Sequence, residues 1–278
     1  MTFTKLNFGT AGIPGTTSIK GTDAGVREVR KLGLDAMEIE FVRGVYMNEK
    51  NAQLVKKAAS ESDVALTVHA PYYINLASAD PKIRHASVQR IIESAVIGDA
   101  AGAFSVTFHA AYYQKQDSEK IYQQVKKYAQ EILGKLKEKG CGISIRPETT
   151  GKETQWGNIR EIIRLSQELE NVLPCVDFAH LHARTGGKEN SYPEFRNTLE
   201  LLEKELGRKV LDNMHIHISG INYSEKGEKN HLQLPDSDLK YKELLKVFKE
   251  FRIKGSVISE SPVPMDDALL IKREYEKI

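Results

Sequence analysis

The chain has 278 residues, and its 40 basic and 38 acidic side chains leave a formal net charge of +2. Hydrophobic residues make up 40% of the chain and charged residues 28%, as in a globular protein that buries a large core. The balanced charge excludes nucleic-acid binding through a basic field over the whole molecule, although it is compatible with a local basic patch.

No run of the sequence approaches the roughly 18 apolar residues of a membrane span. The N-terminal stretch MTFTKLNFGTAG lacks the basic and apolar regions of a signal peptide. We therefore expect a cytoplasmic protein that makes no contact with membranes. The cysteines, Cys141 and Cys175, form no CxxC pair and are expected to be reduced packing residues.

Short apolar runs, most of them rich in Val, Ile and Phe, are predicted to be strands. In chain order they span residues 6–12, 36–41, 65–70, 105–110, 142–148, 172–180, 213–220 and 254–261. Amphipathic patterns predict helices between them, for example over residues 23–33, 118–140 and 241–255, which end in glycines as helix C-termini often do. The polar stretches 185–190 and 223–230 are predicted to be loops.

The alternation of strands and helices predicts a parallel sheet with helical crossovers, which is an α/β fold. Eight such units in under 300 residues favour a (β/α)8 TIM barrel, with an open doubly wound sheet as the alternative. The sequence contains neither a GxGxxG after a strand nor a GxxxxGK[ST] loop. Because no linker interrupts the pattern, we expect residues 1–278 to form a single TIM-barrel domain.

Ionisable residues gather where these strands end. In a TIM barrel the active site lies at the C-terminal ends of the strands, and six consecutive runs carry a histidine or a carboxylate there. These residues are His69, His109, Glu148, Asp177, His180, His215, His217 and Glu260. The loop after the seventh run adds Glu228 and His231. A lone histidine of this kind is more often structural, and His85, which falls in a helical pattern, is expected at the surface.

The mixture of carboxylates and imidazoles predicts a metal centre. Several carboxylates in one buried place repel one another unless cations compensate. Imidazole with carboxylate is the ligand set of Zn²⁺ or, less selectively, of Mn²⁺ or Fe²⁺. Four ligands fill one zinc, so this many candidates imply two or three ions. Closely spaced ions suit phosphoester hydrolysis, because they activate a water and stabilise the attacking and leaving oxygens.

Five segments, VHAPYYINLA, FHAAYY, PETTGKETQWG, CVDFAH and ISES, occur in this order on the predicted strands. In this arrangement the chain resembles the endonuclease IV family of apurinic/apyrimidinic endonucleases over residues 36–262. The resemblance implies a TIM barrel with three zinc ions that hydrolyses DNA 5′ to abasic sites in base excision repair. It also implies a partner in double-stranded DNA containing abasic sites, and we expect the protein to act as a monomer.

The resemblance also implies which residues bind each zinc. His69 and His109 would hold the first ion and share Glu148, the central catalytic residue, with the second. The second ion would be completed by Asp177, Glu260 and a histidine of the seventh strand, with His217 favoured and His215 as its competitor. His180 and His231 would bind the third ion.

The chain departs from the family pattern at the third ion and near the DNA. Lys229 in EKNH stands where the family has an aspartate, and Glu228 lies one residue out of register. Either Glu228 or His182 could supply the missing ligand, or Lys229 could replace the charge of an absent ion. The segment 40–47 differs from the family's DNA-penetrating loop and offers Arg43 and Tyr46 instead. Tyr72 matches a family tyrosine near the DNA, and Arg43, Tyr72 and Lys229 are the candidates for DNA binding.

Two other functions fit parts of the pattern. A sugar isomerase or epimerase of the xylose-isomerase-like barrels needs one divalent ion on a Glu-Asp-His-Glu set. Glu148, Asp177, His217 and Glu260 match that set, but His69, His109 and His231 would be surplus to it. A relative that binds abasic DNA without cleaving it is the third interpretation, and it requires that the altered third site hold no ion.

Overall fold

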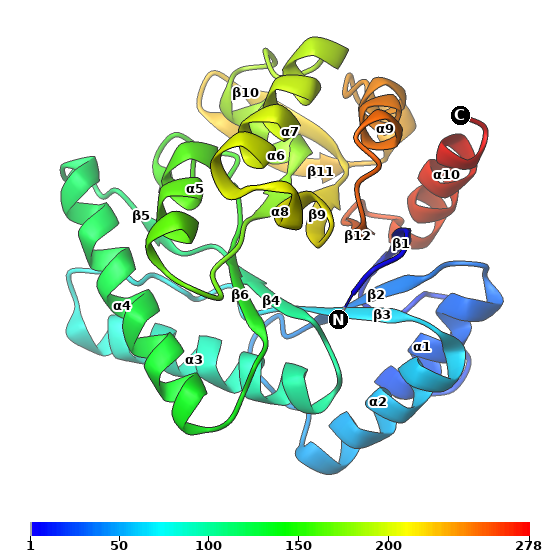
Figure 1. Ribbon diagram of the computed structural model, residues 1–278, viewed down its shortest axis with the longest axis horizontal. Coiled ribbons are helices and arrows are strands. Elements are labelled where there is room, and N and C mark those ends of the chain that lie inside the picture. The colour runs from blue at the N-terminus through cyan, green and yellow to red at the C-terminus, as the bar shows by residue number, and fades with distance from the viewer. Residues whose placement is uncertain (1) are drawn as a thin grey trace.

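Eight parallel strands form one sheet that curves into a barrel in the computed structural model, which describes residues 2–278 (Figure 1). Isolated parallel bridges, Ile145 with Val172 and Glu148 with Cys175, join the two ends of the sheet and complete the ring. The predicted TIM barrel is therefore confirmed, and the open sheet is wrong. In order around the ring the strands are β6 (Ser144–Pro147), β4 (Ser105–Phe108), β3 (Ala65–His69), β2 (Ala36–Glu40), β1 (Leu6–Ala11), β12 (Gly255–Ser259), β9 (Met214–Ile218) and β8 (Cys175–Asp177).

The helices lie around the outside of the strands (Figure 1). They present one apolar face inward, as α9 does with the buried side chains of Leu244, Leu245 and Phe248. The helices are α1 (Thr22–Lys31), α2 (Glu49–Ser62), α3 (Pro81–Ala100), α4 (Ser118–Glu138), α5 (Ile159–Glu168), α6 (Phe178–Arg184), α7 (Tyr192–Leu206), α8 (Arg208–Leu211), α9 (Tyr241–Glu250) and α10 (Pro264–Glu276).

Several predicted boundaries are wrong by a few residues. The helix predicted over 241–255 ends at Glu250, because Arg252 turns to a φ of 48° and Gly255 already begins β12. Gly255 has a φ of 122°, and a Cβ there would lie 2.1 Å from the carbonyl oxygen of Met214, so glycine is required where β12 meets β9.

The run predicted as a strand over 172–180 pairs only through Cys175–Asp177. The side chain of Asp177 accepts a hydrogen bond of 2.6 Å from the backbone N–H of His180, and this contact starts α6. His180 therefore lies on a helix rather than on a strand, one turn after the barrel rim.

The stretch 223–230, predicted as a loop, contributes instead to an antiparallel hairpin of β10 (Gly220–Ser224) and β11 (Gly227–Leu232). The pairing passes from Asn222–Asn230 to Tyr223–Glu228 and skips Lys229, which is the extra residue of a β-bulge. A second short pair, β5 (Ala111–Tyr112) with β7 (Gln155–Trp156), also lies at the rim.

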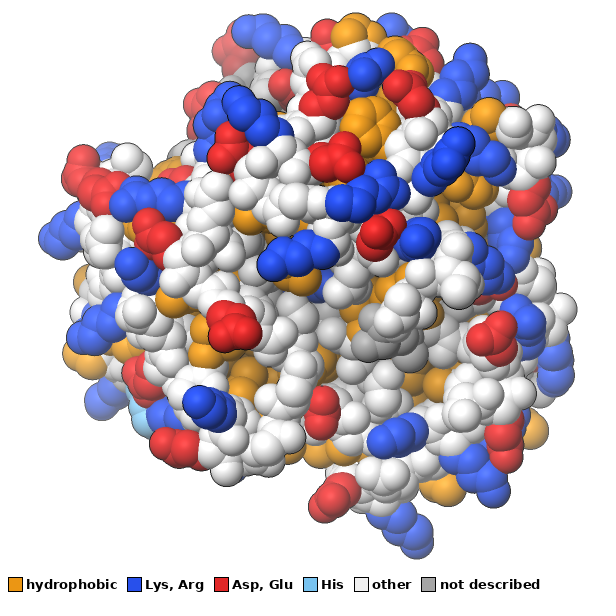
Figure 2. All heavy atoms as spheres, viewed as in Figure 1, with side chains coloured by type: hydrophobic (Ala, Val, Ile, Leu, Met, Phe, Trp, Pro, Cys, Tyr) orange, Lys and Arg blue, Asp and Glu red, His pale blue; other side chains and the backbone are white. Residues whose placement is uncertain are grey.

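Basic and acidic side chains are interspersed over the face shown in Figure 2, in keeping with the balanced net charge. Among the described residues, none of the helices is long and apolar enough to cross a membrane. Cys141 and Cys175 are both free, and Cys175 is buried.

Candidate metal centre

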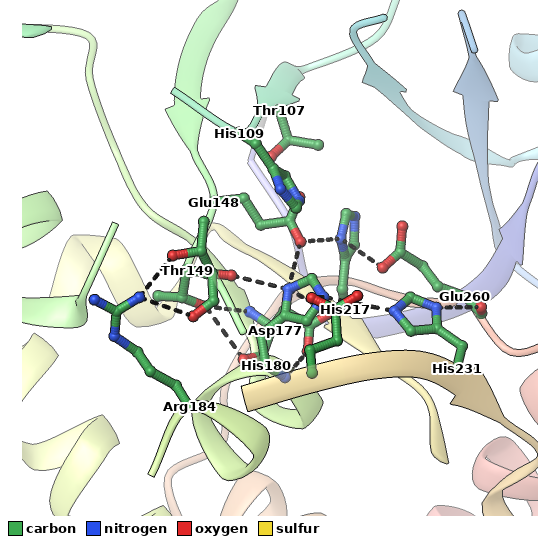
Figure 3. A network of polar contacts seen from close by, with 12 residues as sticks. Thr107, His109, Glu148, Thr149, Asp177, His180, Arg184, His217, His231 and Glu260 are labelled. Carbon is green, nitrogen blue, oxygen red and sulfur yellow. Dashed lines mark hydrogen bonds and ion pairs between the residues drawn. The ribbon is translucent and has the colours of Figure 1, made fainter. Parts of the chain in front are cut away.

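Glu148 lies at the centre of the clustered ionisable residues, one residue beyond β6, and its carboxylate is completely buried (Figure 3). Its Oε2 is 3.3 Å from Nε2 of His69 and 3.2 Å from Nε2 of His109. Its Oε1 is 3.0 Å from Nδ1 of His180 and 3.5 Å from Nδ1 of His217. One carboxylate thus contacts imidazoles from four different elements of the barrel.

Three groups of side chains around Glu148 could each hold a metal ion, since the ligand atoms within each group lie within 4.8 Å of one another. Two of the groups share Glu148, and the third adjoins it through His180. The groups are His69 with His109 and Glu148; Glu148 with Asp177, His217 and Glu260; and His180 with Glu228 and His231.

Unpartnered polar atoms show that these residues fit bound cations. Within the described chain, both oxygens of Glu148, Oδ2 of Asp177 and Nδ1 of His217 are buried without a hydrogen-bond partner, although imidazoles and carboxylates are in contact. Leaving such atoms unpaired costs free energy. Metal ions among them would satisfy them all, and Zn²⁺ takes this set of imidazole and carboxylate ligands.

Backbone carbonyls fix the orientation of three imidazoles. Nδ1 of His69 lies 2.7 Å from the carbonyl oxygen of Ala70, and Nδ1 of His231 lies 2.8 Å from that of Glu260. Nδ1 of His180 lies 3.0 Å from the carbonyl oxygen of Thr149. A carbonyl only accepts, so each Nδ1 donates and the Nε2 lone pair is free to bind a metal.

Without ions, the group is held together by charge. Burial lowers the pKa of His69, but the nearby carboxylates of Glu148 and Glu40 raise it to about 10. Burial raises the pKa of Glu148, yet the imidazoles of His109 and His217 hold it well below its usual range. Protonated imidazoles therefore take the place of cations when no ion is present, and metal binding must displace their protons.

The bulge in β11 brings Glu228, and not Lys229, into the third group. Oε2 of Glu228 is 3.6 Å from Nε2 of His180, and Nε2 of His231 is 3.5 Å from the same nitrogen. Lys229, the residue that the pairing skips, is exposed. A Cβ at Gly151 would lie 2.7 Å from Cβ of Glu228, so the glycine of PETTG leaves the space that the Glu228 side chain occupies.

The other two candidate histidines lie outside the three groups, although His215 forms a further possible group with Cys175 and His217. His182 is buried on α6, and its Nε2 lies 2.9 Å from Oδ1 of Asp238. Tyr223 donates to the other oxygen of Asp238, so His182 supports the β10–β11 hairpin. His215 lies deeper in the barrel than His217, and its Nδ1 is 3.0 Å from the hydroxyl of Ser105. His85 is exposed on α3, as the sequence predicted.

The residues predicted to meet DNA lie at or near the rim. Tyr72 is 62% exposed, and its ring centroid is 6.0 Å from that of His69. Arg43 and Tyr46 line a cavity of about 840 Å³ whose floor includes Glu38 and Glu40 of β2. The cavity therefore lies directly beside the metal centre.

Glu38 and Glu40 were missed by reasoning from the sequence. Both point into the barrel from β2, and Glu38 is completely buried. The signal that could have found them is their spacing in AMEIE, because residues two apart on a strand face the same side. Two carboxylates on the interior face of a barrel strand need partners there.

Comparison with known proteins places the chain among barrels of this kind. A family model described as xylose isomerase-like TIM barrel matches residues 26–276. An uncharacterised protein of Methanocaldococcus jannaschii is 43% identical over 274 residues, which cover 98% of each chain. A Mycoplasma pneumoniae protein named Probable endonuclease 4 is 24% identical over 210 residues, covering 72% of this chain and 69% of its own.

Solved structures of two functional classes share the fold. Endonuclease IV from Thermus thermophilus has a TM-score of 0.74 at 18% identity, covering 98% of this chain and 99% of its own. A D-tagatose 3-epimerase-like protein has a TM-score of 0.72 at 20% identity, covering 98% and 97%. At such identities the likeness shows the fold alone. Together with the curated relatives, it confirms the predicted resemblance to the endonuclease IV family.

Proposed function

The chain belongs to the xylose isomerase-like TIM barrel family, and we propose that within it the protein is a metal-dependent phosphodiesterase that cleaves DNA 5′ to abasic sites. The observation that carries this proposal is the set of three ligand groups arranged around Glu148. Zinc is the favoured ion at each, with Mn²⁺ or Fe²⁺ as alternatives. The distant similarity to proteins named endonuclease 4 supports the choice of DNA as substrate.

We assign the ligands by group. His69, His109 and Glu148 would hold the first ion, while Glu148 would share the second with Asp177, His217 and Glu260. The third would lie between His180, Glu228 and His231. When bound, such ions would activate a water for attack and neutralise charge on the phosphate and the leaving oxygen.

The exposure of the side chains defines the side from which a phosphodiester approaches. The side chains of Asp177 and His217 are completely buried, whereas those of His109, Glu228 and Glu260 are 30%, 17% and 14% exposed. A backbone phosphate would therefore approach from the open side, toward the ions that His109, Glu228 and Glu260 would help to hold. The exposed ring of Tyr72 would then pack on the neighbouring sugar, which lacks a base at an abasic site, and Arg43 would contact a phosphate further along.

A single-metal sugar isomerase or epimerase is the second candidate. It is favoured by one observation: Glu148, Asp177, His217 and Glu260 form a complete set of four ligands by themselves. This second function does not explain the first and third groups, because a single-metal enzyme would not need His69, His109 and His231 as ligands.

Incision of a duplex carrying one tetrahydrofuran abasic-site analogue tests the proposal. Zinc-loaded protein should cut only the damaged strand, immediately 5′ to the analogue, and leave a 3′-hydroxyl that a DNA polymerase can extend. The undamaged duplex is the control substrate. Binding of the damaged duplex without incision by fully loaded protein would contradict the proposal and favour a non-catalytic binding protein. Epimerisation of a ketohexose by the same preparation, without incision, would favour the second candidate.

A further inference from the structure

The carboxylate of Glu38 joins two histidines inside the barrel. Its Oε1 lies 2.9 Å from Nε2 of His217, and its Oε2 lies 2.8 Å from Nε2 of His215. Thr67 donates a hydrogen bond of 2.8 Å to the same Oε2. The side chains of Glu38, His215 and His217 are completely buried. With Glu40 and Glu260, Glu38 also forms a further group of carboxylates whose oxygens lie within 4.8 Å of one another, but the proposed reaction gives it no role of its own.

The contacts of Glu38 cross the barrel. β2, which carries Glu38, is separated from β9, which carries both histidines, by β1 and β12 in the sheet. Ser105 on β4 extends the chain of contacts through its hydroxyl, 3.0 Å from Nδ1 of His215. Glu38 thus couples His217 to side chains on the opposite wall, so His217 has little freedom to rotate.

The chemistry of the carboxylate determines where the hydrogens lie. An ionised carboxylate only accepts, and a bare imidazole nitrogen 2.9 Å from it would set two lone pairs against each other. Nε2 of His217, Nε2 of His215 and Oε1 of Glu38 are buried without a hydrogen-bond partner among the described residues, so hydrogen on each Nε2, facing the carboxylate, is the arrangement that removes this repulsion. A neutral His217 with hydrogen on Nε2 has its lone pair on Nδ1, and Nδ1 lies 3.2 Å from Oε2 of Glu260 and 3.5 Å from Oε1 of Glu148.

We infer that Glu38 is a positioning residue that holds His217 with hydrogen on Nε2 and so presents Nδ1 as the ligand atom of the second metal group. The inference rests on the ligand assignment made in the proposed function. Outer partners of metal-binding histidines act in this way, and their removal typically lowers metal affinity about 10- to 100-fold. Glu38 would therefore set the affinity of one ion without touching it.

Glu38→Met tests the inference, because it keeps a side chain of similar length and removes both acceptor oxygens, so nothing holds hydrogen on Nε2 of His217. Glu38→Gln is a milder variant, since its amide oxygen can still accept from His217 while His215 moves its hydrogen to Nδ1, beside the hydroxyl of Ser105. Glu61→Gln, which removes a charge from an exposed glutamate paired with Arg27, is the matched control. Thr67→Val removes the third contact of Glu38 and keeps its charge.

Zinc affinity is measured by chelator competition for each variant. Glu38→Met should weaken the binding of one ion by about 10- to 100-fold and leave the others unchanged, while Glu61→Gln and Thr67→Val should bind zinc as the unaltered protein does. Equal zinc affinities in Glu38→Met and Glu61→Gln would overturn the inference. The inference would also be overturned if the unaltered protein bound a fourth ion that the Glu38 variant loses, because Glu38 would then be a ligand itself.

Nitrogen-15 NMR of protein with labelled histidines tests the inference on the unaltered chain, so its result does not require that a variant folds. In the zinc-loaded protein, His217 should show hydrogen on Nε2 and none on Nδ1. Hydrogen on Nδ1 would overturn the inference. Neither measurement involves DNA, so a failure to cleave abasic DNA would count against the proposed function and leave this inference standing.

Discussion

Glu228 and Lys229 are neighbours in the sequence, and the structure predicts opposite consequences for them. Glu228→Gln removes a carboxylate that adjoins His180 and His231, and its side chain is only 17% exposed. Lys229→Gln removes an exposed cation from the bulge next to it. Both variants change the charge by one and place the same side chain in the same hairpin, so each is the control for the other.

The expected loss of affinity for the third ion in Glu228→Gln follows from the distance between Glu228 and His180. Its Oε2 is 3.6 Å from Nε2 of His180, so an ion about 2 Å from that nitrogen, on the side that faces Glu228, would lie within about 4 Å of the carboxylate. At an effective dielectric of about 20, a unit charge and a divalent ion attract by about 8 kcal/mol at that distance. Desolvation offsets much of this attraction, and we expect Glu228→Gln to weaken the third ion by about 3–4 kcal/mol. That is about 100- to 1,000-fold in affinity.

Chelator competition and ion counting measure both variants. Lys229 is an exposed charge, so Lys229→Gln should change the affinity by less than about 1 kcal/mol. Cleavage of abasic duplex should fall with the third ion in Glu228→Gln and stay close to normal in Lys229→Gln. An unchanged third ion in Glu228→Gln, or a larger loss in Lys229→Gln, would refute the reasoning from the bulge.

Three further predictions concern the centre itself. His69→Ala and His109→Ala should each lose an ion and reduce abasic-site cleavage by orders of magnitude, whereas His85→Ala, at an exposed position of α3, should change neither; full metal content in either of the first two would disprove the first site. Glu148→Gln should impair both ion binding and cleavage more than any other single change, because a neutral amide cannot offset the repulsion between two cations; normal cleavage would contradict the bridging role. The pKa of His69 is raised from 6.5 to about 10 without ions, so its contribution to stability is full below pH 6.5 and lost as the pH rises through 10. In calorimetry, the melting temperature of protein freed of metal by a chelator should therefore fall between about pH 7 and 10, and that of zinc-loaded protein should fall less. Equal falls of the melting temperature in the two samples would contradict this prediction.

Much of the fold could be predicted from the sequence because the strands are buried on both faces and read as short apolar runs. β12 and β9 are examples, since all five residues of each are buried. The β10–β11 hairpin could not be predicted in this way. Its residues from Gly227 to His231 are mostly polar and partly exposed, so they lack the alternation by which a strand is recognised.

The candidate site could be predicted as far as it depends on strand ends. His69, Glu148 and Asp177 each end or directly follow a barrel strand, and strand ends meet at one rim whatever the details of packing. The choice of Glu228 over His182 depends on a bulge in β11, and the role of Glu38 depends on contacts across the barrel. Neither follows from local sequence, since both are set by tertiary packing.

The number of ions bound per chain tests the central claim most directly. Native mass spectrometry of protein reconstituted with zinc and then freed of excess metal should show three ions per chain, one for each of the groups around Glu148. A chain that binds a single ion under these conditions would contradict the account and would favour a sugar isomerase or epimerase.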